Sequence, residues 1–319
     1  MLAALAALTA AACRARTPPS TVLPASAAFD VCTDRKDRTL SLLTWNIFMM
    51  PPWVRESPRN VARADVIAMV LEEQAYDLVC LQKVFDSAAR DMLAKRLSRL
   101  YPYRYGPAND APSLELNSGV WVLSKHALTN HREIEFDECS GIECLSRKGA
   151  MLLSGRCGAT PFHLISTHLQ GEEGNAFTEK NQRVRLAQVR AIRERLLVPA
   201  TTPGVPVLVC GDLGTPRFEL DGTTETAPYR ELLSILGASS GPEPRITLDE
   251  TPAGSQLVKD GSGRQNELDY VLLCANGAHV SVERERRIFR RAGWDSESGG
   301  WREDLSYRYA VEARVTFGG

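Results

Sequence analysis

Short apolar runs alternate with longer amphipathic stretches from about Leu40 to the end of the chain. The runs are rich in β-branched residues, which predicts buried strands. Two of the longer stretches repeat apolar residues three and four positions apart, which predicts amphipathic helices with one buried face. The strands are expected at Leu40–Phe48, Asp77–Val84, Asn117–Ser124, Phe162–His168, Val205–Asp212, Leu268–Leu273 and Ala310–Phe317, and the helices at Ser57–Gln74 and Asn181–Leu197. This alternation is typical of an α/β domain.

A single domain accounts for residues 39–319, because no internal repeat and no second linker interrupt the pattern. The 44% hydrophobic content of the chain is sufficient for an extensive core. Residues 14–38 carry Pro, Ser, Thr and charged residues without periodicity, which predicts a flexible tether. The long connections at Asp137–Arg147, Gly171–Lys180 and Arg217–Gly263 are expected to be surface loops.

The first thirteen residues, MLAALAALTAAAC, are small and apolar but too few to span a bilayer. They predict an export signal at residues 1–13. The segment resembles a bacterial lipoprotein signal in which Cys13 carries the lipid anchor, although Ala10 stands where a larger aliphatic residue is usual. A plain secretory signal is the alternative. The protein is therefore expected to be exported, as a cell-envelope lipoprotein or as a secreted protein.

The positions of the cysteines and the net charge limit the kinds of function that the chain can have. Cys139 and Cys144 lie close together in a Gly-containing loop and can close a small disulfide, whereas Cys80 and Cys210 lie inside apolar runs and predict buried, unreactive thiols. No Cys and His spacing predicts a zinc site. A formal net charge of −1 gives the chain no overall basic field, so no nucleic-acid partner is expected.

Polar residues close several of the predicted strands, and their order along the chain is the most specific signal in the sequence. The motifs are Thr44-Trp45-Asn46, Leu81-Gln82-Lys83, Ser166-Thr167-His168-Leu169-Gln170, Gly211-Asp212-Leu213-Gly214, Leu268-Asp269-Tyr270 and the segment Leu305–Val311. Each motif alone is weak, but the ordered set resembles the endonuclease/exonuclease/phosphatase superfamily from about Leu40 to Phe317. Within that superfamily the chain is most similar to bacterial sphingomyelinase C enzymes, because of Asn46–Pro52, Cys139–Gly149 and Thr167–Gln170.

This resemblance implies a four-layered α/β sandwich, with two central mixed β-sheets flanked by helices and the motifs gathered at one edge. It also implies Mg²⁺-dependent phosphodiester hydrolysis in active relatives. Four family positions are retained here, at Asn46, His168, Asp212 and Asp269. Four others are substituted, because Lys83, Gly214, Tyr307 and Arg308 stand where relatives carry Glu, Asn, Asp and His.

Lys83 is the most severe of these substitutions, since it replaces an acid that ligates the metal in relatives. An attractive pair of charges −1 and +2 becomes a repulsive pair of +1 and +2, and each unit of charge product is worth roughly 4 kcal/mol at about 4 Å and an effective dielectric near 20. No metal is therefore expected to bind in its usual place. The ammonium of Lys83 is expected to pair with Asp212 instead, and to keep the site folded or to bind phosphate.

The other substitutions also remove working groups. Gly214 offers no side chain to hold a water or a phosphate oxygen, and Tyr307 supplies no carboxylate. Arg308 stays protonated and cannot act as a general base, but it can form a bidentate ion pair with Asp269. His168 is interpreted as a phosphate-contacting residue or, alternatively, as a structural histidine.

The sequence therefore favours a non-catalytic relative of sphingomyelinase C, a pseudoenzyme that keeps the scaffold and binds a phosphate-bearing or lipid ligand through Asn46, His168 and Lys83. No cofactor is expected under that hypothesis. The alternative is an active phosphodiesterase with a rebuilt site, for which Mg²⁺ remains the family cofactor or Lys83 and Arg308 supply positive charge. A secreted deoxyribonuclease is a third, less favoured hypothesis.

Aromatic residues near the end of the chain allow two interpretations. Phe289, Trp294 and Trp301 lie in the region where related sphingomyelinases carry a membrane-inserting hairpin, which favours contact with a membrane or phospholipid surface. Packing in the core is the alternative. Met49, Met50 and Trp53 are expected in the core or in the wall of the site.

Overall fold

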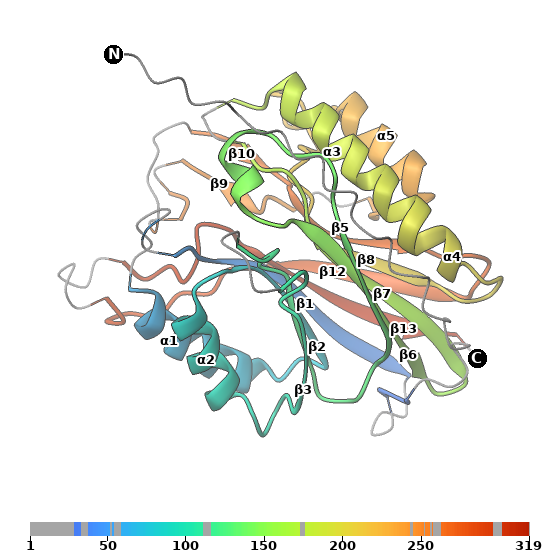
Figure 1. Ribbon diagram of the computed structural model, residues 1–319, viewed down its shortest axis with the longest axis horizontal. Coiled ribbons are helices and arrows are strands. Elements are labelled where there is room, and N and C mark those ends of the chain that lie inside the picture. The colour runs from blue at the N-terminus through green and yellow to red at the C-terminus, as the bar shows by residue number, and fades with distance from the viewer. Residues whose placement is uncertain are drawn as a thin grey trace, which may run out of the picture.

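The structure is a computed structural model in which two β-sheets lie between two pairs of helices (Figure 1). It describes residues 29–32, 38–51, 53, 59–110, 116–172, 176–242, 245–251, 253–255, 257, 263–295 and 302–318. The export signal with Cys13, most of the tether, and Trp301 fall outside the described residues.

One central sheet is six-stranded, with the order β12-β13-β1-β2-β4-β3. Its strands are β1 (Thr39–Met49), β2 (Leu78–Val84), β3 (Tyr103–Tyr105), β4 (Trp121–Ser124), β12 (Val280–Arg287) and β13 (Ala310–Phe317). Strands β1 and β2 pair in parallel, whereas β13 pairs antiparallel with β1. The sheet is therefore mixed, as predicted.

The second central sheet is five-stranded, with the order β11-β8-β7-β6-β5. It contains β5 (Thr129–Glu135), β6 (Gly149–Cys157), β7 (Thr160–His168), β8 (Val207–Asp212) and β11 (Asp269–Cys274). Its pairing is also mixed, because β7 and β8 are parallel and β8 and β11 are antiparallel. A separate two-stranded sheet joins β9 (Leu248–Asp249) to β10 (Gln265–Asn266).

Helices cover the outer face of each central sheet (Figure 1). Helices α1 (Asn60–Gln74) and α2 (Ser87–Arg96) lie on the six-stranded sheet, and α3 (Glu179–Ile192) and α5 (Ala227–Leu236) lie on the five-stranded sheet. A π-helical turn η3 (Arg193–Leu197) and α4 (Val198–Ala200) extend α3. The helices begin at side-chain caps where the sequence offers them, as at Asp86, which accepts a hydrogen bond from the Ala89 amide at 3.1 Å.

Three apolar clusters separate the four layers. One fills the space between α1, α2 and the six-stranded sheet, a second lies between the two sheets, and a third lies between the five-stranded sheet and α3 and α5. Leu42 and Leu164 are buried in the middle cluster, and Val209 is buried in the outer cluster under α3 and α5. Because strands in both sheets are buried on both faces, their apolar runs are nearly continuous in the sequence. The four-layered sandwich expected from the resemblance is confirmed.

Three element predictions need correction. The segment Arg217–Gly263 is not one surface loop, because it contains α5 and β9. The strand predicted at Asn117–Ser124 begins only at Trp121, since Gly119 takes a positive φ of 68° that an extended strand does not allow. The helix expected from Ser57 begins at Asn60.

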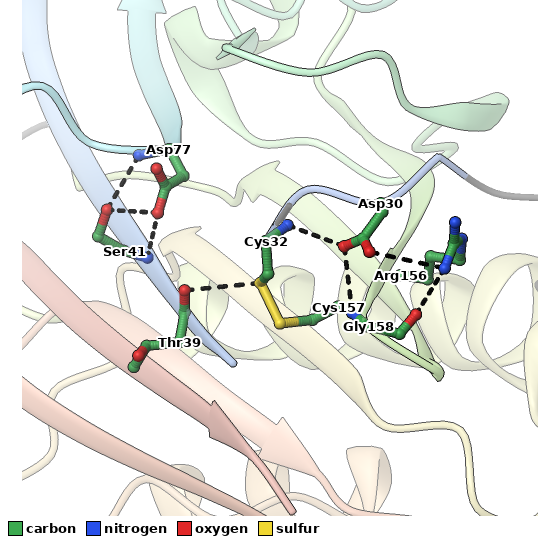
Figure 2. The surroundings of a disulfide bond; sticks show 8 residues. All are labelled: Asp30, Cys32, Thr39, Ser41, Asp77, Arg156, Cys157 and Gly158. Atoms are coloured by element: carbon green, nitrogen blue, oxygen red, sulfur yellow. Dashed lines mark hydrogen bonds and ion pairs between the residues drawn. A yellow bond between two sulfur atoms is a disulfide. The ribbon is translucent and has the colours of Figure 1, made fainter. Parts of the chain in front are cut away.

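A disulfide that the sequence did not suggest connects the start of the domain to its interior. Cys32 is bonded to Cys157 at the end of β6, across a sequence separation of 125 residues, and its sulfur lies 3.5 Å from the carbonyl oxygen of Thr39 (Figure 2). Asp30 supports this junction by accepting hydrogen bonds from the amides of Cys32 and Gly158 at 3.0 and 3.1 Å. Residues 29–32 fall in the segment assigned to the tether, yet they are fixed to the edge of the domain where β1 begins.

The other described cysteines form a second disulfide or are buried thiols. Cys139 is bonded to Cys144, the pair predicted from their spacing. Cys80, Cys210 and Cys274 are buried thiols. Within the described part of the chain, every helix is too short or too polar to cross a lipid bilayer.

Candidate functional site

The motif residues meet at one edge of the sandwich. Strands β1, β2, β7 and β8 end at this edge, and β11 and the segment before β13 begin there, because they run antiparallel to β8 and β1. We call the side chains gathered there the strand-end cluster; they are Asn46, Lys83, Glu143, Lys148, His168, Asp212, Asp269, Tyr307 and Arg308.

Arg308 links two carboxylates of the cluster. One guanidinium nitrogen lies 3.0 Å from Asp269 Oδ2 and the other lies 3.1 Å from Asp212 Oδ2. The arrangement differs from the bidentate pair with Asp269 alone that the sequence suggested, because the planar guanidinium divides its two nitrogens between neighbouring strands β8 and β11. All three side chains are buried. The positive charge of Arg308 is therefore shared by two buried acids.

Burial dominates the titration of this group of charges. It raises the pKa of Asp269 to about 7, against the opposing effect of the Arg308 guanidinium and with the support of the nearby Asp212 charge. Burial also disfavours the charged form of Arg308 and so lowers its pKa. The Asp212 and Asp269 carboxylates outweigh burial, and the pKa of Arg308 is raised. Arg308 is therefore a permanent cation at this edge of the sheets.

Asp212 has further hydrogen bonds that leave it little freedom. Its Oδ2 accepts a hydrogen bond from Asn46 Nδ2 at 2.8 Å, and its Oδ1 accepts one from the Gly214 amide at 3.0 Å. The Asn46 amide also approaches the Tyr307 hydroxyl at 3.5 Å, and its oxygen accepts from the Phe48 amide at 3.2 Å. Asn46 and Asp212, two of the positions interpreted as retained in the sequence analysis, bind each other here.

Lys83 ends β2 in a left-handed conformation, with φ of 56°, which a residue other than Gly adopts at a cost of roughly 1–2 kcal/mol. Its Nζ donates to the Tyr307 hydroxyl at 3.1 Å and lies within 5.5 Å of the centres of the Phe48 and Tyr307 rings. The expected ion pair with Asp212 is not formed, because Asn46 and Arg308 already occupy that carboxylate. Burial alone lowers the pKa of Lys83, but Tyr307 and the carboxylates of Glu143 and Asp212 together raise it.

His168 is neutral at physiological pH. Burial and the charges of Lys148, Lys83 and Arg308 hold the pKa of His168 well below its usual value. Its Nε2 lies 3.2 Å from Lys148 Nζ, and since an ammonium group only donates, Nε2 accepts and the ring proton belongs to Nδ1. His168 Nδ1 is buried without a hydrogen-bond partner among the described residues.

Lys148 and Glu143 form an ion pair that completes the cluster. Besides contacting Glu143 and His168, Lys148 Nζ donates to the Leu169 carbonyl oxygen at 2.6 Å. Burial lowers the pKa of Lys148, although the Glu143 charge opposes the shift. Burial also disfavours the charged form of Glu143, but Lys148 and Lys83 outweigh it and lower the pKa of Glu143 to about 2. Glu143 is therefore ionised at pH 7, and its carboxylate lies within ion-pair distance of Lys148.

The backbone at this edge is fixed by buried polar contacts. Arg63 of α1 donates to the carbonyl oxygens of Ile47 and Phe48 at 2.5 and 2.6 Å, and to that of Leu305 at 2.8 Å. Ser306 Oγ donates to the Asn46 carbonyl oxygen at 2.5 Å. These bonds tie the end of β1 to the segment before β13, so that Asn46, Tyr307 and Arg308 are held side by side.

Gly214 has a conformation and a setting that suit glycine. Its φ is 59°, and a Cβ atom there would lie 2.8 Å from the Gln170 carbonyl oxygen and 3.3 Å from the Arg185 side chain. The space that a side chain at position 214 would need is therefore filled by the neighbouring backbone of Gln170 and the side chain of Arg185.

The donor set does not fit Mg²⁺, which prefers several oxygen ligands and few nearby cations. Arg308 already pairs with both Asp212 and Asp269, and Lys83 places an ammonium group beside Asn46 and Tyr307. Among the residues that the structure describes, no group of three or more His, Cys, Asp and Glu side chains is placed to hold a metal ion. The charged side chains of the cluster are instead three cations and three acids, in which Arg308 pairs with Asp212 and Asp269 and Lys148 pairs with Glu143.

Comparison with known proteins identifies the family. The sequence pattern of the Endonuclease/Exonuclease/phosphatase family matches residues 43–288, which include five of the six motifs. The chain belongs to this family. Among curated proteins, it is 24% identical to a sphingomyelinase C of Bacillus cereus over 312 residues, covering 91% of this chain and 92% of that protein. It is 23% identical to a phospholipase C of Staphylococcus aureus over 201 residues, covering 58% of this chain and 61% of that protein.

Solved structures of family members share the fold. A structure of beta toxin from Staphylococcus aureus superposes with a TM-score of 0.74 at 20% identity, covering 86% of this chain and 99% of that one. Sphingomyelinase C from Streptomyces griseocarneus superposes with a TM-score of 0.70 at 24% identity, with the same coverage. At these identities the likeness establishes the architecture. The resemblance to bacterial sphingomyelinase C enzymes is confirmed.

Two members of the cluster were not predicted, namely Glu143 and Lys148. Both lie in the segment Cys139–Gly149 that carried part of the resemblance, but no role was assigned to them. The signal available in the sequence was a Glu between two closely spaced cysteines and a Lys directly before a buried strand. Only the tertiary structure shows that these side chains reach the ends of β2 and β7.

The aromatic residues expected to contact lipid are placed differently from that expectation. Trp294 is buried in the core, and Phe289 packs on Trp45 with ring centres 5.0 Å apart. Core packing, the alternative interpretation, holds for both. Met49 is buried as expected, whereas Trp53 is 68% exposed and is not a core residue.

Proposed function

We propose that this chain is a non-catalytic family member that uses the sphingomyelinase-like scaffold to bind a phosphate-bearing ligand at the strand-end cluster. The observation that carries the proposal is the position of Arg308 between Asp212 and Asp269. A side-chain cation that is always charged contacts both acids, so a divalent ion at either carboxylate would meet the positive charge of Arg308 at close range.

His168 supports the same proposal. Its Nε2 accepts a hydrogen bond from Lys148, and burial together with the surrounding cations holds the pKa of His168 well below the usual value. A general base works best when its pKa lies near the operating pH and its lone pair faces the proton to be removed. His168 satisfies neither condition in this arrangement, and it is better suited to a structural or anion-contacting role.

The cations of the cluster favour an anionic ligand. Lys83 and Tyr307 are half-buried, so both reach solvent at the same edge, and Lys148 and Arg308 lie deeper. An ammonium and a phenol hydroxyl at 3.1 Å from each other can both donate to one phosphate oxygen. The curated relatives are a sphingomyelinase C and a phospholipase C by name, which favours a phospholipid headgroup as the source of the phosphate.

Three measurements on the purified protein test the proposal. Hydrolysis of sphingomyelin vesicles and of bis-p-nitrophenyl phosphate is followed with Mg²⁺ and with a chelator, calorimetry measures Mg²⁺ uptake, and equilibrium dialysis measures binding of inorganic phosphate. We expect no Mg²⁺-dependent turnover and saturable phosphate binding that Lys83→Ala weakens at least tenfold. Lys95→Ala, which removes the same charge from an exposed position of α2, is the matched control. Turnover that requires Mg²⁺ refutes the proposal.

One observation favours a second candidate, a phosphodiesterase with a rebuilt site. Lys83, Lys148 and Arg308 together supply the positive charge that stabilises a phosphoryl transition state in metal-independent chemistry. Turnover that is insensitive to chelator and lost in Lys83→Ala, but kept in Lys95→Ala, distinguishes this enzyme from a binding protein.

Export is part of the proposed function. The two disulfides, Cys32–Cys157 and Cys139–Cys144, support an oxidising compartment. A solved relative is titled a toxin, which agrees with a protein that acts outside the cell. Mass spectrometry of the mature N-terminus distinguishes a lipid on Cys13 from a plain secretory cleavage, and flotation with sphingomyelin vesicles tests contact with a phospholipid surface.

A further inference from the structure

A short turn that is closed by a disulfide places Glu143 in the cluster. The turn comprises the 3₁₀ helix η2 (Gly141–Leu145) and its flanks, and the disulfide between Cys139 and Cys144 closes it with a Cα–Cα distance of 5.3 Å. We call residues Cys139–Ser146 the Glu143 turn. Its only acidic side chain at the cluster, Glu143, points away from solvent onto Lys148.

The surroundings of the Glu143 carboxylate are those of a bound anion. It forms an ion pair with Lys148, accepts a hydrogen bond from the Gly171 amide at 3.3 Å, and is stabilised electrostatically by Lys83. A Cβ atom at Gly171 would lie 3.3 Å from Glu143 Oε2, so a glycine there leaves the carboxylate room to approach the backbone. Two ammonium groups and a backbone amide are the donors that proteins use to hold phosphate.

The charge balance leads to the same conclusion. With Glu143 in place, the cations Lys83, Lys148 and Arg308 face three carboxylates. If the Glu143 carboxylate moved away, the cluster would carry at least one unpaired positive charge, because Asp269, with a pKa of about 7, is only partly ionised at pH 7. A monoanionic phosphate, such as the diester of a phospholipid headgroup, would restore the balance in the same position.

The Glu143 turn is held to the body by polar contacts that can be exchanged. No residue of η2 is buried, and its apolar side chains Ile142 and Leu145 are 52% and 48% exposed. Gln170 holds the turn through hydrogen bonds with the amide and the carbonyl oxygen of Ser140, at 3.0 and 3.1 Å. A segment that buries so little apolar surface opens at a lower free energy than the sheets around it.

We propose that Glu143 is an internal anion that occupies the phosphate site, and that a ligand binds only when the Glu143 turn moves aside. Displacement of Glu143 by a ligand rests on the proposed phosphate-binding function, whereas the mobility of the turn does not. The disulfide between Cys139 and Cys144 limits this movement and keeps the carboxylate on Lys148. Moving the turn aside thus costs free energy that ligand binding must offset.

Phosphate binding to Glu143→Gln tests the displacement. Glutamine keeps the size of the side chain and an acceptor for the Gly171 amide, but it removes the charge that competes with phosphate. Equilibrium dialysis at pH 7 is expected to give at least tenfold tighter binding of inorganic phosphate than in the unmodified protein. The control is Glu179→Gln, the same charge change at a side chain that is 95% exposed, with an expected change below twofold. Equal affinities in Glu143→Gln and the unmodified protein overturn the inference.

Hydrogen exchange in the absence of any ligand tests the movement of the turn separately. Exchange of the Gly171 amide is measured in the unmodified protein and in the double variant Cys139→Ser, Cys144→Ser, with the buried amide of Val209 as the internal reference for folding. We expect Gly171 to exchange at least tenfold faster in the variant, while Val209 is unchanged. If no protein binds phosphate, the proposed function fails, and this experiment still decides the turn: unchanged exchange at Gly171 overturns its mobility.

Discussion

Arg308 is the side chain on which the ionised state of the cluster depends, and its removal makes the sharpest prediction. Arg308→Met keeps a long side chain but deletes the guanidinium that lies 3.1 Å from Asp212 and 3.0 Å from Asp269. Both carboxylates then stay buried without their cation, which costs about 3–5 kcal/mol of unfolding free energy. At a urea dependence of about 3 kcal/mol per molar, the unfolding midpoint falls by about 1–1.7 M.

The loss is expected to depend on pH in a defined direction. Asp269 has a folded pKa of about 7, whereas an unfolded aspartate titrates near about 3.9. Between about pH 4 and 7 the folded state binds more protons than the unfolded state, so the contribution of Asp269 to stability falls as the pH rises through that window. Without Arg308 the folded pKa of Asp269 rises further. The destabilisation of Arg308→Met is therefore expected to be similar at pH 5 and 6 and to grow as the pH rises through 7 to 8.

Urea unfolding followed by tryptophan fluorescence at pH 5, 6, 7 and 8 measures this dependence. Adding Asp269→Asn to Arg308→Met removes one of the two unpaired acids and is expected to recover much of the loss at pH 8. The control Arg183→Met deletes a guanidinium that is 74% exposed and is expected to change stability by less than about 0.5 kcal/mol. An Arg308→Met protein as stable as the unmodified one at pH 8 would refute the reasoning.

Three further predictions concern stability and the surface. Replacing both Cys32 and Cys157 by Ser is expected to remove up to about 5 kcal/mol, because the disulfide spans 125 residues, and calorimetric melting checks this; full stability in the variant contradicts the assignment. Gly214→Asn is expected to cost about 1–3 kcal/mol, since its Cβ meets the Gln170 carbonyl oxygen at 2.8 Å, and a melting temperature equal to that of the unmodified protein argues against it. Trp53→Ala is expected to change stability by less than about 0.5 kcal/mol, because the side chain is 68% exposed, and a large loss in urea unfolding would show hidden packing.

The fold was predictable because its strands carry strong local signals. Runs such as Val205–Asp212 are apolar on both faces, and the acids and amides at their ends fall at one edge once the strands pair in parallel. The positions of Asn46 and Asp212 follow from that pattern, whereas Asp269 reaches the same edge at the start of the antiparallel strand β11. Helix α5 was not predicted, because it lies within Arg217–Gly263, which was interpreted as one long surface loop.

The contacts inside the site were harder to predict, because several side chains can pair with the same carboxylate and the sequence does not show which of them does. Lys83 was expected on Asp212, but the shorter Asn46 and the planar Arg308 occupy that acid, and Lys83 turns to Tyr307. Glu143 lies in a surface turn, where sequence gives little indication of what a side chain contacts. The pairing of Cys32 with Cys157 is likewise a tertiary fact, since spacing does not determine connectivity at such separations.

The disulfide of Cys32 lies at the end of the domain opposite the strand-end cluster. It fixes the entry of the chain where β1 and β7 begin, while Lys83 and His168 lie where β2 and β7 finish. Nine residues of β7 at about 3.3 Å each separate the two ends by about 30 Å. The point where the chain enters the domain and the side chain of Lys83 therefore lie at opposite ends of the sandwich, so a ligand that reaches Lys83 approaches from the end away from that entry point.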